Sequence, residues 1–203
     1  LAKKYKFKII EDASHALGAT FKDQVIGENR FSDVTVFSFH PVKTITTGEG
    51  GAVLVSEKKD FLKARSLRSH GITRESLDST VDFPSWFYRQ NMLGYNFRMS
   101  ELHAALGISQ IQKLDSFIDK RNILANEYKN MLYKMPLKFQ KILSGCRSSY
   151  HLFTIEILDQ KIRRNDLYNF LQSKKIGCQV HYIPVHNLDF FKKMGFSNGT
   201  FKN

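Results

Sequence analysis

"SDVTVFSFHPVKTITTGEGGAVLVS", residues 32–56, places two short apolar runs on either side of a polar loop with one lysine. The runs "VTVFSF" and "GAVLVS" are apolar and rich in valine, which is typical of buried strands. Ser38, Lys43 and the Gly-Glu-Gly-Gly turn of residues 48–51 lie where these runs meet the loop. Open α/β sheets bind their ligands at strand ends, so the loop is a candidate site.

The flanking segments extend the pattern of alternating strands and helices. Residues 7–12, "FKIIED", predict another buried strand that ends at carboxylates, and residues 18–28 predict turns. Residues 57–71 have helical spacing and a glycine stop, whereas residues 72–93 have no clear period and predict a long loop.

The second half of the chain begins with its strongest helical pattern, over residues 99–135, with Ser100 as N-cap and a kink near Gly107. A small α+β unit is expected beyond it, with strands at 150–158 and 176–185, a helix at 163–175 and a short helix from His186. The fold class is therefore α/β, and the domain boundary is expected within the long helix, near residues 115 to 135. We assign residues 1–115 to a large domain and 116–203 to the connecting helix and the small domain.

Composition restricts the class of protein. The 203 residues carry a net charge of +12, spread along the chain without a block of like charges. No apolar run is long enough to cross a bilayer, and Cys146 and Cys178 have no metal-ligand spacing. We expect a cytoplasmic protein without a metal and without a membrane segment, and a basic nucleic-acid-binding module stays a distant alternative. The first residue, Leu1, and the turn-forming end "SNGTFKN" indicate a fragment of a longer chain.

Asp12 and Lys43 suggest a specific chemistry. An aspartate at one strand end and a lysine after another form a recurring pair in enzymes that use pyridoxal 5'-phosphate. The amine bonds to the cofactor's aldehyde, and the carboxylate keeps the pyridine nitrogen protonated. Either residue alone is a weak signal, because most loop lysines are solvated and most strand-end carboxylates only order turns.

Longer motifs resemble one family. "IIEDASHALGATF", "SDVTVFSFHPVKTITTGEGGAVLVS", "LRSHGI" and "GYNFRMSELHAALGISQIQKLD" are similar to the DegT/DnrJ/EryC1/StrS sugar aminotransferases, over residues 5 to 190. The spelling is most similar to the branch that aminates nucleotide sugars at C4 for pseudaminic acid. The resemblance implies part of a fold type I (aspartate aminotransferase-like) large domain, followed by a small α+β domain. It also implies a homodimer with shared active sites.

The resemblance gives each site residue a role. Lys43 matches the family's Schiff-base lysine, and Asp12 matches the carboxylate on the pyridine nitrogen. His15 lies where the family has His or Gln near the ring, and Ser38 matches a hydroxyl on the cofactor phosphate. Asn96 matches an asparagine that reaches the phosphate bound by the other subunit. Ser38 and Asn96 also have plainer interpretations, as groups that only order a strand end and a turn.

Substrates follow from the same resemblance. It implies a UDP-linked 4-keto-6-deoxy-N-acetylhexosamine as acceptor and glutamate as amino donor. His181, Tyr182 and His186 are candidates for substrate contact, with ordinary packing as the equal alternative. The family's phosphate-binding turn and the residue stacked on its pyridine precede "IIED" and lie outside these 203 residues. An inactive truncated scaffold therefore stays open. A sugar dehydratase is disfavoured, since those members of the family replace the lysine with histidine.

Overall fold

A computed structural model describes residues 1–74, 84–197, 199 and 201. The chain forms two compact units, Leu1–Lys134 with Phe139–Thr154, and Met135–Lys138 with Ile155–Asn203. Each unit is described below by itself. The assignment of residues 1–115 and 116–203 to the two domains of the complete fold stays a prediction.

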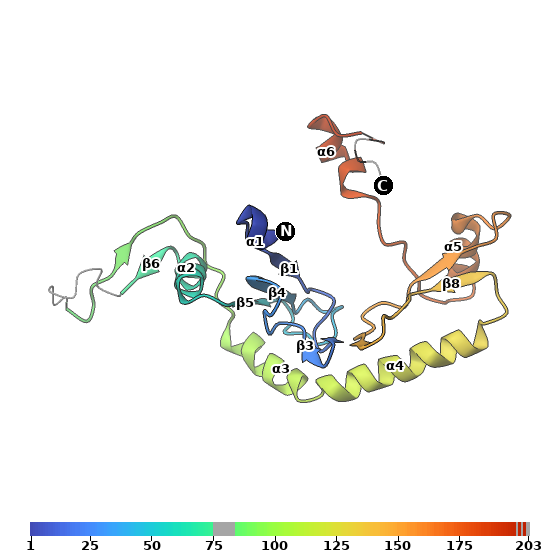
Figure 1. Cartoon of the computed structure of the whole chain (residues 1–203), viewed down its shortest axis with the longest axis horizontal. Coiled ribbons are helices and arrows are strands. Elements are labelled where there is room, and N and C mark those ends of the chain that lie inside the picture. Colours follow the sequence, from blue (N-terminus) through green and yellow to red (C-terminus); the bar gives the residue numbers. More distant parts are fainter. Residues whose placement is uncertain (75–83, 198, 200, 202–203) are drawn as a thin grey trace. The chain divides into compact units, whose positions relative to one another are not determined.

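The first unit is built on a three-stranded sheet (Figure 1). Its strands are β1 (Ile10–Asp12), β4 (Val34–Ser38) and β5 (Gly51–Val55), in the order β1-β4-β5. β1 runs parallel to β4, with Asp12 opposite Val36, and β5 returns antiparallel, with Gly51 opposite Ser38. The three predicted strands are confirmed. The parallel pairing brings the carboxyl ends of β1 and β4 to the same edge.

The predicted burial of residues 7–12 is wrong. Phe7 is 50% exposed, Ile9 37% and Ile10 69%. β1 is also shorter than predicted, because among the described strands it pairs only with β4, and that ladder begins at Ile10. An apolar sequence predicts a buried strand, but the number of covered faces depends on what packs around it.

A second small sheet joins distant parts of the chain. β2 (Thr20–Phe21) and β3 (Gln24–Val25) form a hairpin, and β9 (Cys146–Arg147) pairs antiparallel with β2. Lys22 and Asp23 occupy the two-residue turn with φ of 48° and 64°, as a tight hairpin requires. The pairing of β9 with β2 brings the residues after Arg147 close to the segment that follows β1, where Ser149 bonds to the carbonyl of His15.

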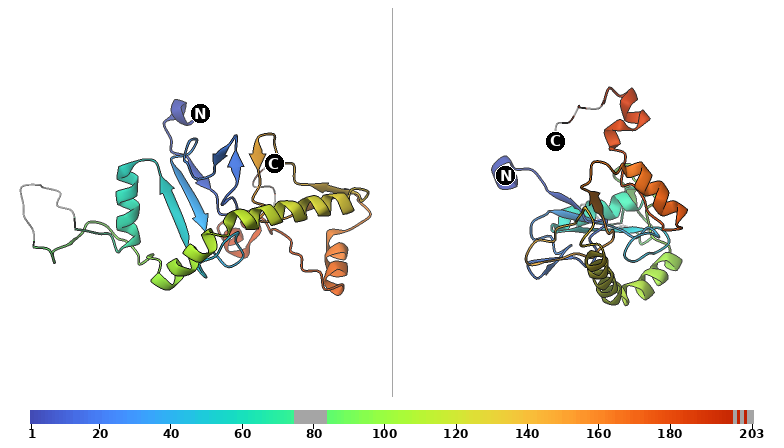
Figure 2. Two further views of the ribbon diagram at one scale, coloured as in Figure 1. Left: turned by 90° about the horizontal axis from the view of Figure 1, so that it is seen from below. Right: turned by 90° about the vertical axis from the view of Figure 1, so that its right-hand side faces the viewer.

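α2 (Lys58–Arg68) lies beside β5 (Figure 2). The expected loop over 72–93 contains a short pair of strands, β6 (Ile72–Thr73) and β7 (Arg89–Gln90), and its residues 75–83 lie outside the described ones. Gly71 has φ of +72° and lies three residues after Arg68, the last residue of α2, close to where the sequence predicted a stop.

The long helix is divided in two, α3 (Glu101–Ile111) and α4 (Leu114–Met131). Ser100 caps α3 as predicted, since its hydroxyl accepts the N–H of His103 at 3.3 Å. The predicted kink near Gly107 is wrong: α3 continues through it, and an alanine Cβ there would lie 2.8 Å from Thr47 Cγ2. Gly107 thus permits close packing, and the break falls about one and a half turns later, between Ile111 and Leu114.

The second unit differs from the prediction in its strands. β8 (Leu137–Phe139) and β10 (Ile155–Ile157) pair, and they are followed by α5 (Arg164–Ser173), the 3-10 helix η1 (Val185–Asn187) and α6 (Asp189–Lys193). The strand predicted over 150–158 is reduced to β10. The strand predicted over 176–185 is wrong, because within the described part of the chain no neighbouring strand supplies the hydrogen bonds that a strand needs.

The buried residues of the first unit come from parts of the chain that are far apart in sequence. They include Ala13, Thr35, Phe37, Ile118 and Tyr150. Two buried stretches lie next to the candidate site. Thr44, Ile45 and Thr47 follow Lys43 in the sequence, whereas Ser149 and Tyr150 follow β9 and reach the site through the bond of Ser149 to His15. Among the described residues, no helix is both long enough and apolar enough to span a membrane.

Candidate active site

Asp12 closes β1 and is held as a carboxylate. The N–H of Ser14 donates to Asp12 Oδ1 at 3.0 Å, and the Ser14 hydroxyl donates to the same oxygen at 2.5 Å. These two hydrogen bonds lower the pKa of the Asp12 carboxyl, the hydroxyl more than the N–H. Burial opposes them with an effect smaller than that of either hydrogen bond, and the charges of His15 and then Lys43 lower the pKa by smaller amounts still. Asp12 is therefore ionised, with a histidine and an amine close enough to act on it.

The loop after β4 folds back on itself and carries Lys43. The N–H of Lys43 donates to the carbonyl of His40 at 2.9 Å, and the N–H of His40 donates to Ser38 Oγ at 3.4 Å. Thr44 and Ile45, directly after Lys43, are buried, whereas Lys43 itself is half-buried. The lysine is thus fixed by a buried stretch on one side and a turn on the other.

The Gly-Glu-Gly-Gly turn lets β5 return close to β4. A Cβ on Gly51 would lie 2.6 Å from the backbone oxygen of Phe37, and one on Gly50 would lie 2.5 Å from Thr47 Oγ1. The turn is closed by the N–H of Phe39, which donates to the carbonyl of Gly50 at 2.8 Å. These glycines allow a close approach of backbone that side chains would prevent.

Asn96 comes from a separate segment. Asn96 pairs with Ser69 in an isolated antiparallel bridge just beyond α2, and the N–H of Tyr95 donates to the carbonyl of Leu67 at 2.9 Å. The bridge to Ser69 holds the backbone of Asn96 in place. The residue is exposed, so its side-chain amide is open to a ligand.

The three substrate candidates belong to the second unit. His181 and Tyr182 are adjacent and exposed, with ring centroids 4.3 Å apart. The ring of His186 packs edge-on against Phe201 at 5.2 Å. Their placement relative to the first unit's residues stays a prediction.

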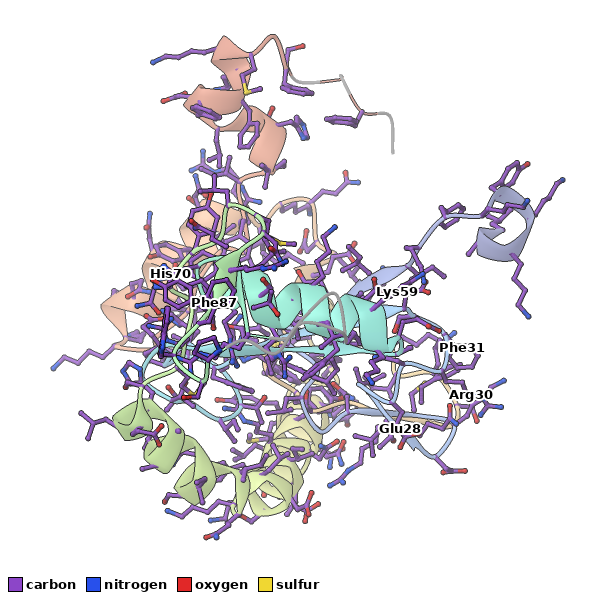
Figure 3. The ribbon with its side chains drawn as sticks, turned by 90° about the vertical axis from the view of Figure 1, so that its left-hand side faces the viewer. Glu28, Arg30, Phe31, Lys59, His70 and Phe87 are labelled. Carbon is purple, nitrogen blue, oxygen red and sulfur yellow. The ribbon has the colours of Figure 1, made fainter. Side chains whose placement is uncertain are left out.

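Hollows elsewhere in the first unit do not contain these residues. Cavities of about 550 and 320 Å³ are lined by residues that include Gly27, Glu28 and Asn29. Figure 3 shows Glu28, Arg30 and Phe31 close together there, with the Arg30 guanidinium 5.4 Å from the Phe31 ring. In the described part of the chain, no group of three or more His, Cys, Asp or Glu residues could hold a metal ion.

Ser14 is the neighbour of Asp12 that the sequence reasoning missed. An Asp followed two residues later by Ser is a common turn pattern, in which the side chains bond to the local backbone. That pattern was available in "EDASH" but indicates no function by itself. Ser149 and His151, which contact His15, had no signal at all, since they lie more than 130 residues away in the sequence.

Relatives of known name match nearly the whole length of this chain. A transaminase of Campylobacter jejuni serotype O:2, named for UDP-4-amino-4,6-dideoxy-N-acetyl-beta-L-altrosamine, is 41% identical over 196 residues, which are 96% of this chain and 50% of that protein. The Helicobacter pylori aminotransferase PseC, involved in the biosynthesis of pseudoaminic acid, matches 95% of this chain and 50% of its own, with TM-score 0.80 and 31% identity. Spr1654 of Streptococcus pneumoniae, described as a sugar aminotransferase and solved in its PLP form, matches with TM-score 0.81 and 26% identity over 97% of this chain and 50% of its own.

The chain spans about half the length of the curated relatives it matches. The model of the DegT/DnrJ/EryC1/StrS aminotransferase family matches residues 1–203, which is every residue of the chain. The strand-end aspartate, the lysine loop and the glycine turn all lie within that match. The chain belongs to the DegT/DnrJ/EryC1/StrS aminotransferase family.

Proposed function

We propose that this chain carries the lysine-bearing part of a pyridoxal 5'-phosphate-dependent aminotransferase. The observation that carries the proposal is the Asp12 carboxylate at the end of β1, whose pKa is lowered by its hydrogen bonds from Ser14 and, to a smaller extent, by the charges of His15 and Lys43. The PLP form of Spr1654, a family relative, supports the same cofactor here. The residues present fit the cofactor: an ionised carboxylate, a primary amine, and the Ser38 hydroxyl on the neighbouring strand end.

When bound, pyridoxal 5'-phosphate supplies an aldehyde carbon and a ring that accepts electrons. Asp12 would hold the pyridine nitrogen protonated, because a carboxylate with a lowered pKa stays charged beside it. Lys43 would take the proton from the α-carbon of the amino donor and deliver a proton to C4 of the sugar. Ser38 would donate to the phosphate, and Asn96 to the phosphate held by a second subunit.

We propose a UDP-linked 4-keto-6-deoxy-N-acetylhexosamine as acceptor and glutamate as donor. The names of the Campylobacter and Helicobacter relatives support this substrate class. His181 and Tyr182 are exposed and available for substrate contact, whereas the contact of His186 with Phe201 favours a packing role for that histidine. The free thiols of Cys146 and Cys178 support a reducing compartment such as the cytoplasm.

Covalent trapping tests the proposal without an activity assay. The full chain is incubated with pyridoxal 5'-phosphate and reduced with borohydride, and its peptides are analysed by mass spectrometry. We expect the pyridoxyl adduct on Lys43 and its loss in Lys43→Arg, which keeps the positive charge but lacks the reactive amine. Lys113→Arg, on the helix break outside the site, is the matched control and keeps the adduct. Equal labelling of several lysines, with Lys43 not preferred, would refute the assignment.

A further inference from the structure

Two residues after β9 contact His15 from different sides. The hydroxyl of Ser149 donates to the carbonyl of His15 at 3.0 Å, across 134 residues of sequence. The ring of His151 lies 4.3 Å from the ring of His15, tilted by 50°. Ser149 is only 1% exposed, whereas His15 is exposed. One contact thus holds the backbone of His15 from the interior, and the other limits the rotation of its ring.

Helix α4 fixes the segment that makes these contacts. Arg121 Nη1 donates to the carbonyls of Tyr150 and His151 at 3.1 and 3.3 Å. Asn122 Nδ2 donates to the carbonyl of Ser148 at 3.0 Å. Three backbone carbonyls in residues 148–151 therefore accept hydrogen bonds from side chains of α4. These bonds limit how far the segment can move.

Tyr150 adds a second restraint on this segment. It has φ of +40°, a conformation that costs free energy for a residue with a side chain. The conformation is held by its N–H, which donates to Ser148 Oγ at 3.1 Å, and by Lys129 Nζ, which donates to its hydroxyl at 2.7 Å. Tyr150 is 7% exposed. Tyr150, strained and buried between Ser149 and His151, therefore holds the backbone of this segment in a single conformation.

The residues on the other side of His15 lead to the site. Ala13 is 2% exposed, and its N–H donates to the carbonyl of Val36 on β4 at 2.9 Å, which continues the pairing of β1 past Asp12. The N–H of Ala16 donates to the carbonyl of Ala13 at 2.9 Å and closes a turn around His15. The backbone around His15 is thus bonded to β4 on one side and to Ser149 on the other, while the ring is left exposed.

We propose that Ser149 and His151 are positioning residues for His15, and that α4 holds them against it. The inference rests on the proposed function, because it takes His15 as the residue beside the cofactor ring. Ser149 fixes the turn that carries His15, and His151 fixes the plane of its imidazole. A histidine with one ring orientation pays no ordering cost when a flat ligand binds against it.

The first test measures the orientation of His15 without any cofactor. Histidine side-chain resonances of the isotope-labelled full chain are recorded by NMR, and His15 is assigned with His15→Gln. We expect one narrow His15 resonance that moves and broadens in Ser149→Ala and in His151→Ala. Ser149→Thr keeps the hydroxyl and restores the position, and His151→Phe keeps a ring in contact and restores the narrow line. Ser116→Ala, which removes a comparable hydroxyl bond to the Lys113 carbonyl at 2.8 Å, leaves it unchanged.

The second test measures the effect on the cofactor. Loss of one hydrogen bond that fixes the histidine raises the Kd for pyridoxal 5'-phosphate about three- to tenfold in Ser149→Ala. The borohydride adduct on Lys43 still forms at saturating cofactor, because the amine is untouched. Melting curves by circular dichroism identify any variant that has unfolded; if Ser149→Ala has unfolded, His151→Ala takes its place in the Kd comparison.

The outcomes separate the inference from the proposed function. An unchanged His15 resonance in both alanine variants overturns the inference, whatever Lys43 does. A moved resonance with an unchanged Kd also overturns it, because the segment then only packs. If the parent chain forms no Lys43 adduct, the proposed function fails, and that failure is recorded on a different residue.

Discussion

Gly51→Ala tests the structural basis of the lysine loop. The added Cβ would lie 2.6 Å from the backbone oxygen of Phe37, far inside van der Waals contact. Backbone oxygen cannot rotate away, so β5 must move from β4 where Gly51 faces Ser38. Such overpacking costs about 1–3 kcal/mol. The smaller entropy of the unfolded alanine chain offsets about 0.4–1 kcal/mol, because glycine has more unfolded conformations to lose. The net loss is therefore about 1–2 kcal/mol.

Thermal unfolding measures this loss. For a chain of this size, about 1–2 kcal/mol lowers the melting temperature by roughly 2–8 °C. Gly177→Ala is the matched control, because no atom lies within 4 Å of its added Cβ and its backbone is not left-handed. That control is expected to be neutral or slightly stabilising.

A melting temperature of Gly51→Ala equal to that of Gly177→Ala would refute the reasoning. It would mean that β4 and β5 separate at no cost, and hence that the close return of the strand does not hold the loop. Circular dichroism at several scan rates distinguishes a true equilibrium shift from faster aggregation.

Two further variants examine the carboxylate and the core. Ser14→Ala removes the hydroxyl that lowers the pKa of Asp12, so its pKa rises toward the ordinary value. A lowered carboxylate pKa stabilises the fold above the unfolded value, about 3.9, and this is lost as pH falls through the folded value. The variant should therefore melt below the parent at neutral pH and match it in strong acid, whereas Ser14→Thr follows the parent; a gap that persists in acid would contradict this cause. Ile118→Ala removes a side chain that is 0% exposed, so we expect the free energy of unfolding, measured in urea, to fall by about 2–5 kcal/mol. Ile123→Ala, at a side chain that is 57% exposed, is the control and should change it little. Equal urea midpoints for the two variants would place Ile118 outside the core.

Local features of the sequence predicted local features of the structure. The valine-rich runs predicted β4 and β5, and the Ser100 N-cap began α3 at the expected residue. These features depend on residues within a few positions of one another, so sequence periodicity and side-chain chemistry specify them. Asp12 and Lys43 were expected to act together because each follows a predicted strand; the parallel pairing of β1 with β4 brings the carboxyl ends of both strands to one sheet edge, and the roles of the two residues stay a proposal.

Errors occurred where a distant contact decides the outcome. Residues 176–185 alternate like a strand but find no partner strand among the described residues to complete their hydrogen bonds. Gly107 resembles a helix breaker, yet its missing side chain makes room for Thr47 from the lysine loop. The apolar sequence of residues 7–12 predicted burial, but Ile10 lies 69% exposed on the edge strand.

The sequence by itself determined the strands beside the lysine loop and the family motifs that contain Asp12 and Lys43. Only the tertiary structure decided that Ser149 and His151 meet His15, because β9 pairs with β2 and α4 anchors the segment beyond it. Strand and cap preferences act over a few bonds of the chain and can be read locally. A contact across 134 residues has no local signature, since it forms only when separate elements pack together.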